Sequence, residues 1–111
     1  MPAVHADLPL PMAPPPFDVE WRTEGVLIRP LRTAGEPLAE RARMRHCSAT
    51  HFGPIVAGRA FVFAATVNGR PLTVELLRHA GGRLLLSEIV GRANREPTTD
   101  ERAAVAAWAR R

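Results

Sequence analysis

The sequence contains no lysine, no tyrosine and only one cysteine. A single cysteine excludes an internal disulfide and any zinc module built from several cysteines. No apolar run reaches the roughly 18 to 20 residues of a membrane-spanning helix, so the sequence predicts a soluble cytoplasmic protein without a membrane partner. The 111 residues provide for one domain, which would bury roughly two thirds of its unfolded surface.

The absence of lysine also changes how the charge is interpreted. All 15 basic residues are arginine, and with 11 acidic residues they give a net charge of +4. Residues 1 to 40 carry −3 and residues 41 to 111 carry +7, so the excess lies in the second part. Arginine stays charged to very alkaline pH, and the calculated pI near 11.2 therefore overstates how basic the surface is near neutrality. The pI alone is weak evidence for a nucleic-acid partner.

Proline is concentrated at the start of the chain, where six of the 11 prolines lie within the first 16 residues. Proline has no backbone N–H and cannot extend a helix or a β-ladder. The composition predicts a disordered, polyproline-like leader over residues 1 to 16, followed by a domain over residues 17 to 111. The spacing of Pro11 and Pro14 leaves a second interpretation open, in which this segment is a ligand for a proline-recognition domain.

Two pairs of residues have the spacing of a helix capping box. The first pair, Thr33 and Glu36, predicts a helix that runs to Cys47 and carries His46 on its inner face with Leu38. The arginines of this helix would then lie on its outer faces.

The second pair, Thr98 and Glu101, follows a proline and predicts the last helix. Apolar residues at helical spacing predict its buried stripe: Ala104, Val105 and Trp108. Acidic residues in the first turn and two arginines at the end suit the helix dipole.

Between these helices, Asn68-Gly69 is a strong signal for a two-residue hairpin turn. Closing the hairpin there pairs apolar residues on one face: Phe63 with Val74, Phe61 with Leu76, and Ala65 with Leu72. That face is the predicted core.

Gly81-Gly82 is a weaker signal for a second turn. A two-residue loop there pairs Val74 with Ile89 and Leu76 with Ser87, and it places Glu75 opposite Glu88 on the other face. Earlier in the chain, residues 26 to 29 form a short apolar run that a proline ends, which suits an edge strand or a strand end. The sequence thus predicts a small single α+β domain: a helix, a three-stranded antiparallel meander and a C-terminal helix, with an N-terminal edge strand as an optional addition.

Short motifs follow one another in a fixed order through this domain. They are Met44-x-His46-Cys47, Gly58-Arg59, Thr73-x-Glu75 and Gly91-x-x-Asn94, with Trp108 in the last helix. In this order and spacing, residues 26 to 111 resemble the PcfJ-like domain. Three positions depart from the usual pattern of that family: Ser48 replaces Val, His51 replaces Tyr and Glu88 replaces Gln. The resemblance implies an accessory domain of conjugative plasmids, phages and other mobile genetic elements, here as a stand-alone copy, and it implies no established molecular activity.

Three residues are candidates for catalysis. His46 could act as general base or proton donor because imidazole titrates near neutrality. Glu75 and Glu88, if they lie opposite each other, could divide acid and base roles as paired carboxylates do in hydrolases. With Asn94 they would form the polar site of a small hydrolase-like or transferase-like enzyme. The alternative is structural, a hydrogen-bonded core histidine and two carboxylates bridged by an arginine.

A metal site has less support. His46, Cys47 and His51, with His79 as a distant fourth residue, have ligand chemistry that zinc accepts. Adjacent residues on a helix point roughly 100° apart, so His46 and Cys47 cannot easily hold one ion. We expect no metal and no cofactor.

The arginines suggest binding of an anion or of nucleic acid. Guanidinium groups bind phosphate through two hydrogen bonds, and the best-placed candidates are Arg43, Arg59, Arg92 and Arg95, with Asn94 in the turn between the last two. Few aromatic residues accompany them, and an arginine-only composition also arises from coding bias. The favoured interpretation is a non-catalytic accessory module that contacts nucleic acid, or a protein of the mobile element or its host, through an arginine-rich surface.

Overall fold

The structure, a computed structural model, describes residues 6–45 and 52–111. Its centre is one antiparallel sheet whose strands neighbour one another in chain order. The strands are β1 (Trp21–Thr23), β2 (Val26–Pro30), β3 (Ala60–Val67), β4 (Arg70–Arg78) and β5 (Leu84–Gly91). The α+β class is confirmed, but the described sheet has five strands instead of the three in the predicted meander.

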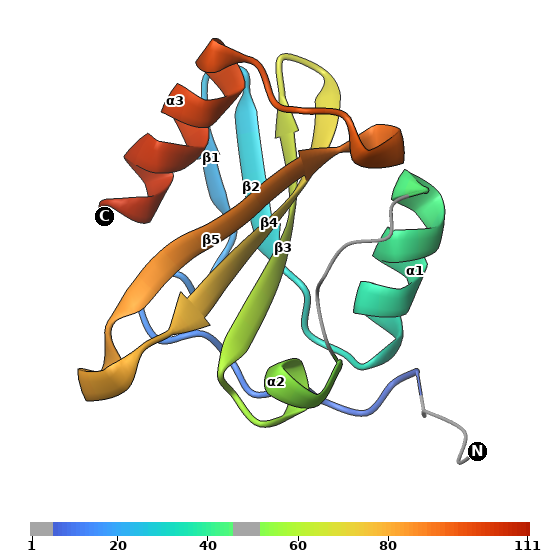
Figure 1. Ribbon diagram of the computed structural model, residues 1–111, viewed down its shortest axis with the longest axis vertical. Coiled ribbons are helices and arrows are strands. Elements are labelled where there is room, and N and C mark those ends of the chain that lie inside the picture. The colour runs from blue at the N-terminus through green and yellow to red at the C-terminus, as the bar shows by residue number, and fades with distance from the viewer. Residues whose placement is uncertain (1–5, 46–51) are drawn as a thin grey trace.

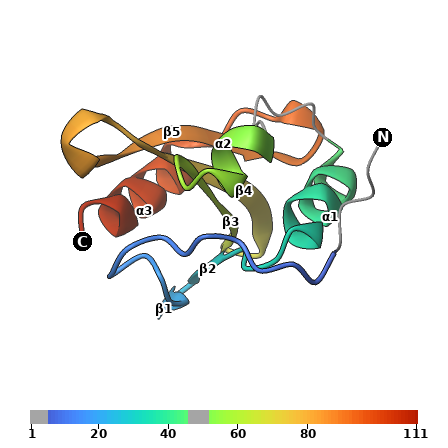
Figure 2. The same ribbon diagram turned by 90° about the horizontal axis from the view of Figure 1, so that it is seen from below.

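Helices cover both faces of this sheet (Figures 1 and 2). Helix α3 (Thr99–Ala109) lies on one face, and α1 (Gly35–Met44) and α2 (Phe52–Val56) lie on the other. Two short 3-10 turns, η1 (Ala80–Gly82) and η2 (Arg92–Asn94), precede and follow β5. In the described part of the chain, no helix is long and apolar enough to cross a membrane.

The core on the α3 face is built around Trp108, which is 1% exposed. Its indole meets the rings of Phe63 and Phe17 edge-on, with centroids 4.7 and 5.1 Å away. Val105 is fully buried beside it, and Ala104 is half-buried against the same cluster. The predicted stripe of this helix is confirmed.

The first hairpin also follows the prediction. Asn68 and Gly69 both have positive φ, 50° and 81°, as a type I′ turn requires. The observed partners of β3 and β4 are those predicted: Phe61 with Leu76, Phe63 with Val74, and Ala65 with Leu72.

The register between β4 and β5 is confirmed only in part. Val74 faces Ile89 and Glu75 faces Glu88 as predicted, but Leu76 faces Leu86 instead of Ser87. The strands are joined by residues 79–83 and not by a two-residue loop, and a bulge at Ser87 absorbs the difference.

The apolar run at residues 26 to 29 is not an edge strand. It belongs to β2, which pairs with β3 on one side and with β1 on the other. Pro30 is tolerated because it stands at the end of the ladder, where a missing N–H costs least. The described edges of the sheet are β1 and β5.

Helix α1 begins at Gly35, close to the predicted start, but the predicted capping box does not form: the N-cap is Ala34, without a side-chain hydrogen bond, and Glu36 accepts from the N–H of Thr33 at 3.1 Å. The helix ends at Met44, after which Arg45 adopts a left-handed conformation (φ 53°). Its buried residues are Pro37, Glu40 and Met44, whereas Leu38 is 47% exposed. The predicted inner face with Leu38 is therefore wrong, because a buried hydrogen bond and the large Met44 side chain decide which face packs. His46 and Cys47 lie outside the described residues.

The proline-rich leader is packed where it is described. We call residues 6–17 the strap. The N–H of Leu10 donates a hydrogen bond to the carbonyl oxygen of Arg32 (2.9 Å), and the N–H of Ala34 donates one to the carbonyl oxygen of Leu8 (2.8 Å). The prediction of a disordered leader is corrected for residues 6–16, because the prolines at 9 and 11 leave the N–H of Leu10 free to pair with the loop before α1.

The strap joins the two cores. Leu10 is buried on the α1 and α2 face, in a cluster with Leu31, Ile55 and Val62. Phe17 is buried with Trp108 on the α3 face. Between these points the strap passes around one end of the sheet (Figure 2).

Candidate nucleic-acid interface

A buried carboxylate fixes the orientation of α1 on the sheet. Glu40 is 4% exposed, and its Oε2 accepts a hydrogen bond from the hydroxyl of Thr73 on β4 at 2.7 Å. Its Oε1 accepts from the guanidinium of Arg43. Because both oxygens are engaged, the helix cannot turn about its axis without leaving a buried charge unpaired. The flanks of α1 are therefore defined.

One flank of α1 faces β2 and carries balanced charge. Arg43 and Arg29 line an open cleft of about 200 Å³ between the helix and the strand. Each is paired in the cleft, Arg43 with Glu40 and Arg29 with Glu36 at 3.0 Å. This flank has little net charge to offer an anion.

The opposite flank of α1 carries Arg41, which at roughly 100° per residue lies on the other side of the buried stripe from Arg43. Arg45 follows directly after the last residue of the helix, in a left-handed conformation. Because β2 lies beside the Arg43 flank, this second flank faces β5 and the turn that follows it, and α1 packs against η2. Figure 1 shows the C-terminal end of α1 next to η2.

Arg92 of η2 completes a group of three arginines at this place. We call Arg41, Arg45 and Arg92 the arginine patch. All three are exposed, and no carboxylate of the described residues forms an ion pair with any of them. The patch therefore presents positive charge that the described part of the domain does not neutralise.

The η2 turn that carries Arg92 is closed by its own backbone. The N–H of Gly91 donates to the carbonyl of Arg95 at 2.8 Å, and the N–H of Arg95 donates to the carbonyl of Arg92 at 3.1 Å. Ala93 and Asn94, which lie between Arg92 and Arg95, have left-handed φ values of 56° and 64°. Asparagine tolerates this conformation better than most residues, which gives the Gly-x-x-Asn motif a structural reason. Asn94 itself is exposed.

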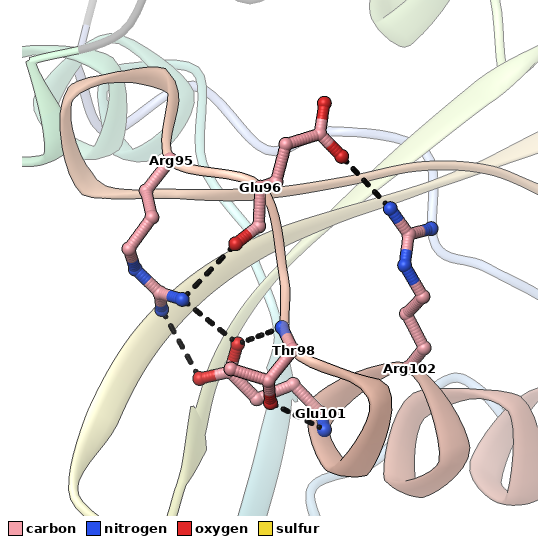
Figure 3. Close-up of polar contacts among 5 residues, drawn as sticks. All are labelled: Arg95, Glu96, Thr98, Glu101 and Arg102. Atoms are coloured by element: carbon pink, nitrogen blue, oxygen red, sulfur yellow. Dashed lines mark hydrogen bonds and ion pairs between the residues drawn. The ribbon is translucent and has the colours of Figure 1, made fainter.

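Arg95 has a structural task (Figure 3). Its guanidinium donates two hydrogen bonds to the buried carboxylate of Glu101, at 3.0 and 3.1 Å, and one to the carbonyl of Glu96. A Cβ on Gly91 would stand 2.9 Å from Nε of Arg95, so a side chain at this position would have to displace the guanidinium that binds Glu101. The ion pair with Glu101 neutralises much of the charge that Arg95 would offer to an anion.

Glu101 also completes the predicted capping box of α3. Its Oε1 accepts from the N–H of Thr98 at 2.8 Å, and its own N–H donates to the hydroxyl of Thr98 at 3.1 Å. The hydrogen bonds from Arg95 hold the pKa of the Glu101 carboxyl below its ordinary value and raise the pKa of Arg95. The start of α3 is thereby tied to the end of β5.

This arrangement predicts how the stability of the domain depends on pH. Glu101→Gln should lower the free energy of unfolding at neutral pH by about 2 kcal/mol, because a buried charge-assisted pair is lost. The pKa of Glu101 is depressed in the folded state, so its contribution is complete above the ordinary value of about 4.5 and is lost as the pH falls through the lowered pKa. Urea unfolding of both proteins from neutral to acidic pH should show the difference shrinking. A constant difference would contradict this role of Glu101.

The predicted catalytic residues are only partly brought together. Glu75 and Glu88 lie opposite each other as predicted, on the face that α1 covers, with Glu75 7% exposed and Glu88 half-buried. Asn94 lies beyond the end of β5 on η2, and His46 lies outside the described residues. Arg59 precedes β3 at the end of the sheet opposite to η2, so it is separate from the arginine patch.

Two features of this region were not predicted from the sequence. The contact between Glu40 and Thr73 has a signal, because Pro37, Glu40 and Met44 have the spacing of one helix face. The proximity of Arg92 to α1 has none, since it depends on packing between distant segments. Among the described residues, no three histidine, cysteine or acidic residues are grouped to hold a metal ion, and His46, Cys47 and His51 lie outside them.

Comparison with known proteins gives no further indication, since no family model, no curated protein and no solved structure matches this chain.

Proposed function

We propose that this chain is a non-catalytic module that contacts nucleic acid through the arginine patch. The observation that carries the proposal is the position of three exposed arginines where α1 packs against η2, Arg41 on the helix, Arg45 at its end and Arg92 on the turn, without ion pairs to described carboxylates. Many of the other arginines are engaged within the domain. Five of them form ion pairs, with Glu20, Glu36, Glu40, Glu96 and Glu101. The guanidinium groups of Arg78 and Arg111 lie over aromatic rings.

The patch would bind phosphate oxygens and read no bases. Three guanidinium contacts release about three condensed counterions, which corresponds to a slope of roughly −3 in a plot of log affinity against log salt concentration. Of the aromatic side chains, Phe17, Phe61, Phe63 and Trp108 are buried in the core, and Trp21 lies beneath Arg111. Stacking of bases on these rings is therefore not part of the proposal.

We propose further that the chain contains a PcfJ-like domain of a plasmid, phage or other mobile element. What supports this is that several motif residues have defined tasks in one fold. Thr73 binds the carboxylate that orients α1, Gly91 makes room for Arg95, and Trp108 fills the core. In such an element, a module that holds nucleic acid without sequence preference would serve as an accessory to the protein that processes it.

Charge reversal tests the nucleic-acid proposal. We expect Arg92→Glu to weaken binding to a short fluorescently labelled DNA duplex at least tenfold and to make the salt slope about one unit shallower. Fluorescence anisotropy between about 50 and 200 mM salt measures both quantities. The matched control is Arg22→Glu, since Arg22 is 69% exposed and lies on β1, away from the patch. Equal binding by the two variants, or affinity that ignores salt, would overturn the proposal.

The alternative function is a small hydrolase-like or transferase-like enzyme, and the confirmed pairing of Glu75 with Glu88 is the observation that favours it. The same binding reactions separate the alternatives when they are run on a denaturing gel. The module proposal expects intact strands. Cleavage by the wild-type chain that is lost in Glu88→Gln would replace the module by a nuclease.

A further inference from the structure

The edge strand β5 has an outer edge that no described strand covers. Its eight residues read LLLSEIVG, and Glu88 is the single charge among them. Leu85 is 38% exposed, and the strand contains neither proline nor lysine, which commonly protect the edges of sheets. Figure 2 shows β5 at the margin of the sheet, with α3 on one side and α1 on the other.

We propose that a second copy of this chain pairs with β5, antiparallel and about a two-fold axis, so that one sheet continues through both copies. A two-fold axis makes the interface self-complementary, so the strand must offer matching residues to itself. The sequence and the bulge of β5 meet this condition in one register.

The bulge decides which side chains share a face. Leu84 and Leu86 pack toward the α3 core. Leu85 and Glu88 lie on the other face, where they oppose Leu77 and Glu75 of β4. Ser87 is the extra residue between them, and Arg83, in an extended conformation, continues the face of Leu85.

An axis at Leu85 gives complementary pairs. Leu85 then lies opposite its own copy, Leu84 opposite the second Leu86, and Arg83 opposite the second Glu88, with each of the last two pairs made twice. An axis at Glu88 would set two carboxylates against each other, and an axis at Leu86 would set Leu85 against Glu88. Charge and apolar contacts therefore select the Leu85 register.

Analytical ultracentrifugation of the full chain over a range of concentrations tests this dimer. We expect a reversible dimer for the wild type. Arg83→Glu should weaken it about tenfold or more, because both copies of the Arg83–Glu88 pair change from attraction to repulsion. Glu88→Arg should do the same. An equimolar mixture of the two variants should restore dimers, since the charges are again opposite.

Further variants keep the outcome decisive. Arg110→Glu changes charge by the same amount on the exposed end of the chain after α3 and should leave the dimer intact. Leu85→Lys places two like charges at the axis and should give monomers with the far-UV circular dichroism of the wild type. A wild type that stays monomeric, a dimer that ignores Arg83→Glu and Leu85→Lys, or a mixture that fails to restore dimers would each overturn the inference.

Discussion

Replacing Trp108 by alanine is expected to lower the free energy of unfolding by about 3 to 5 kcal/mol, the largest effect of any single substitution proposed for this chain. Its indole is 1% exposed and meets Phe17 of the strap and Phe63 of β3 edge-on. Alanine would leave a cavity between three segments that are distant in sequence. Because the surrounding rings cannot all collapse into it, the loss includes a cavity contribution as well as the lost burial.

The other tryptophan provides the matched control. Trp21 on β1 is half-buried, and the guanidinium of Arg111 lies 5.3 Å from its ring centroid. Trp21→Ala should cost about 1 kcal/mol, because a cation–π contact and partial burial are lost at an edge strand. Urea unfolding followed by far-UV circular dichroism compares the two variants without depending on tryptophan fluorescence. If Trp108→Ala cost no more than Trp21→Ala, the described core would be wrong.

The features that the sequence predicted correctly are those with local causes. The turn at Asn68-Gly69 fixes the register of β3 with β4 through its own backbone geometry. The capping box of Thr98 and Glu101 depends on residues three apart, and it marks the start of α3 correctly. The pairing of Glu75 with Glu88 was predicted by extending the alternation of inward and outward side chains from the first hairpin to a third strand.

The errors arise where distant contacts outweigh local preference. Leu38 is a better core residue than Glu40 by hydropathy, yet Glu40 is buried because Thr73 on another strand satisfies its carboxylate. The predicted pairing of Leu76 with Ser87 was wrong because the turn signal at Gly81-Gly82 does not determine the length of the loop. A bulge at Ser87 shifts the pairs between the bulge and the loop by one residue.

The candidate site shows the same division among its arginines. Arg92 and Arg95 flank one turn and have equal standing in the sequence. In the fold, Arg95 is held by the buried carboxylate of Glu101, whereas Arg92 joins Arg41 and Arg45 beside α1. A charge excess after residue 40 can be read from the sequence. Which arginines remain available to a ligand depends on the partners that folding gives the others.

The strap provides a second large effect that separates the structure from the sequence prediction. We expect Leu10→Ala to lower the free energy of unfolding by about 2 to 3 kcal/mol, because Leu10 is 8% exposed and packs against Leu31 and Ile55. Leu8→Ala, two residues earlier in the same segment, should change it by less than about 0.5 kcal/mol, since Leu8 is 52% exposed.

The two variants lose the same atoms and keep the same backbone hydrogen bonds, so burial is the main difference between them. Urea unfolding of both, with the wild type as reference, measures the contrast. A disordered leader would make the two substitutions equally neutral, and that result would show that the strap does not pack on the domain.

The contrast also bears on cooperativity, because the strap contacts the core on both faces of the sheet. If Leu10→Ala weakens the whole domain in one transition, the two cores unfold together through this segment. A separate early transition would instead show that the strap detaches before the sheet unfolds.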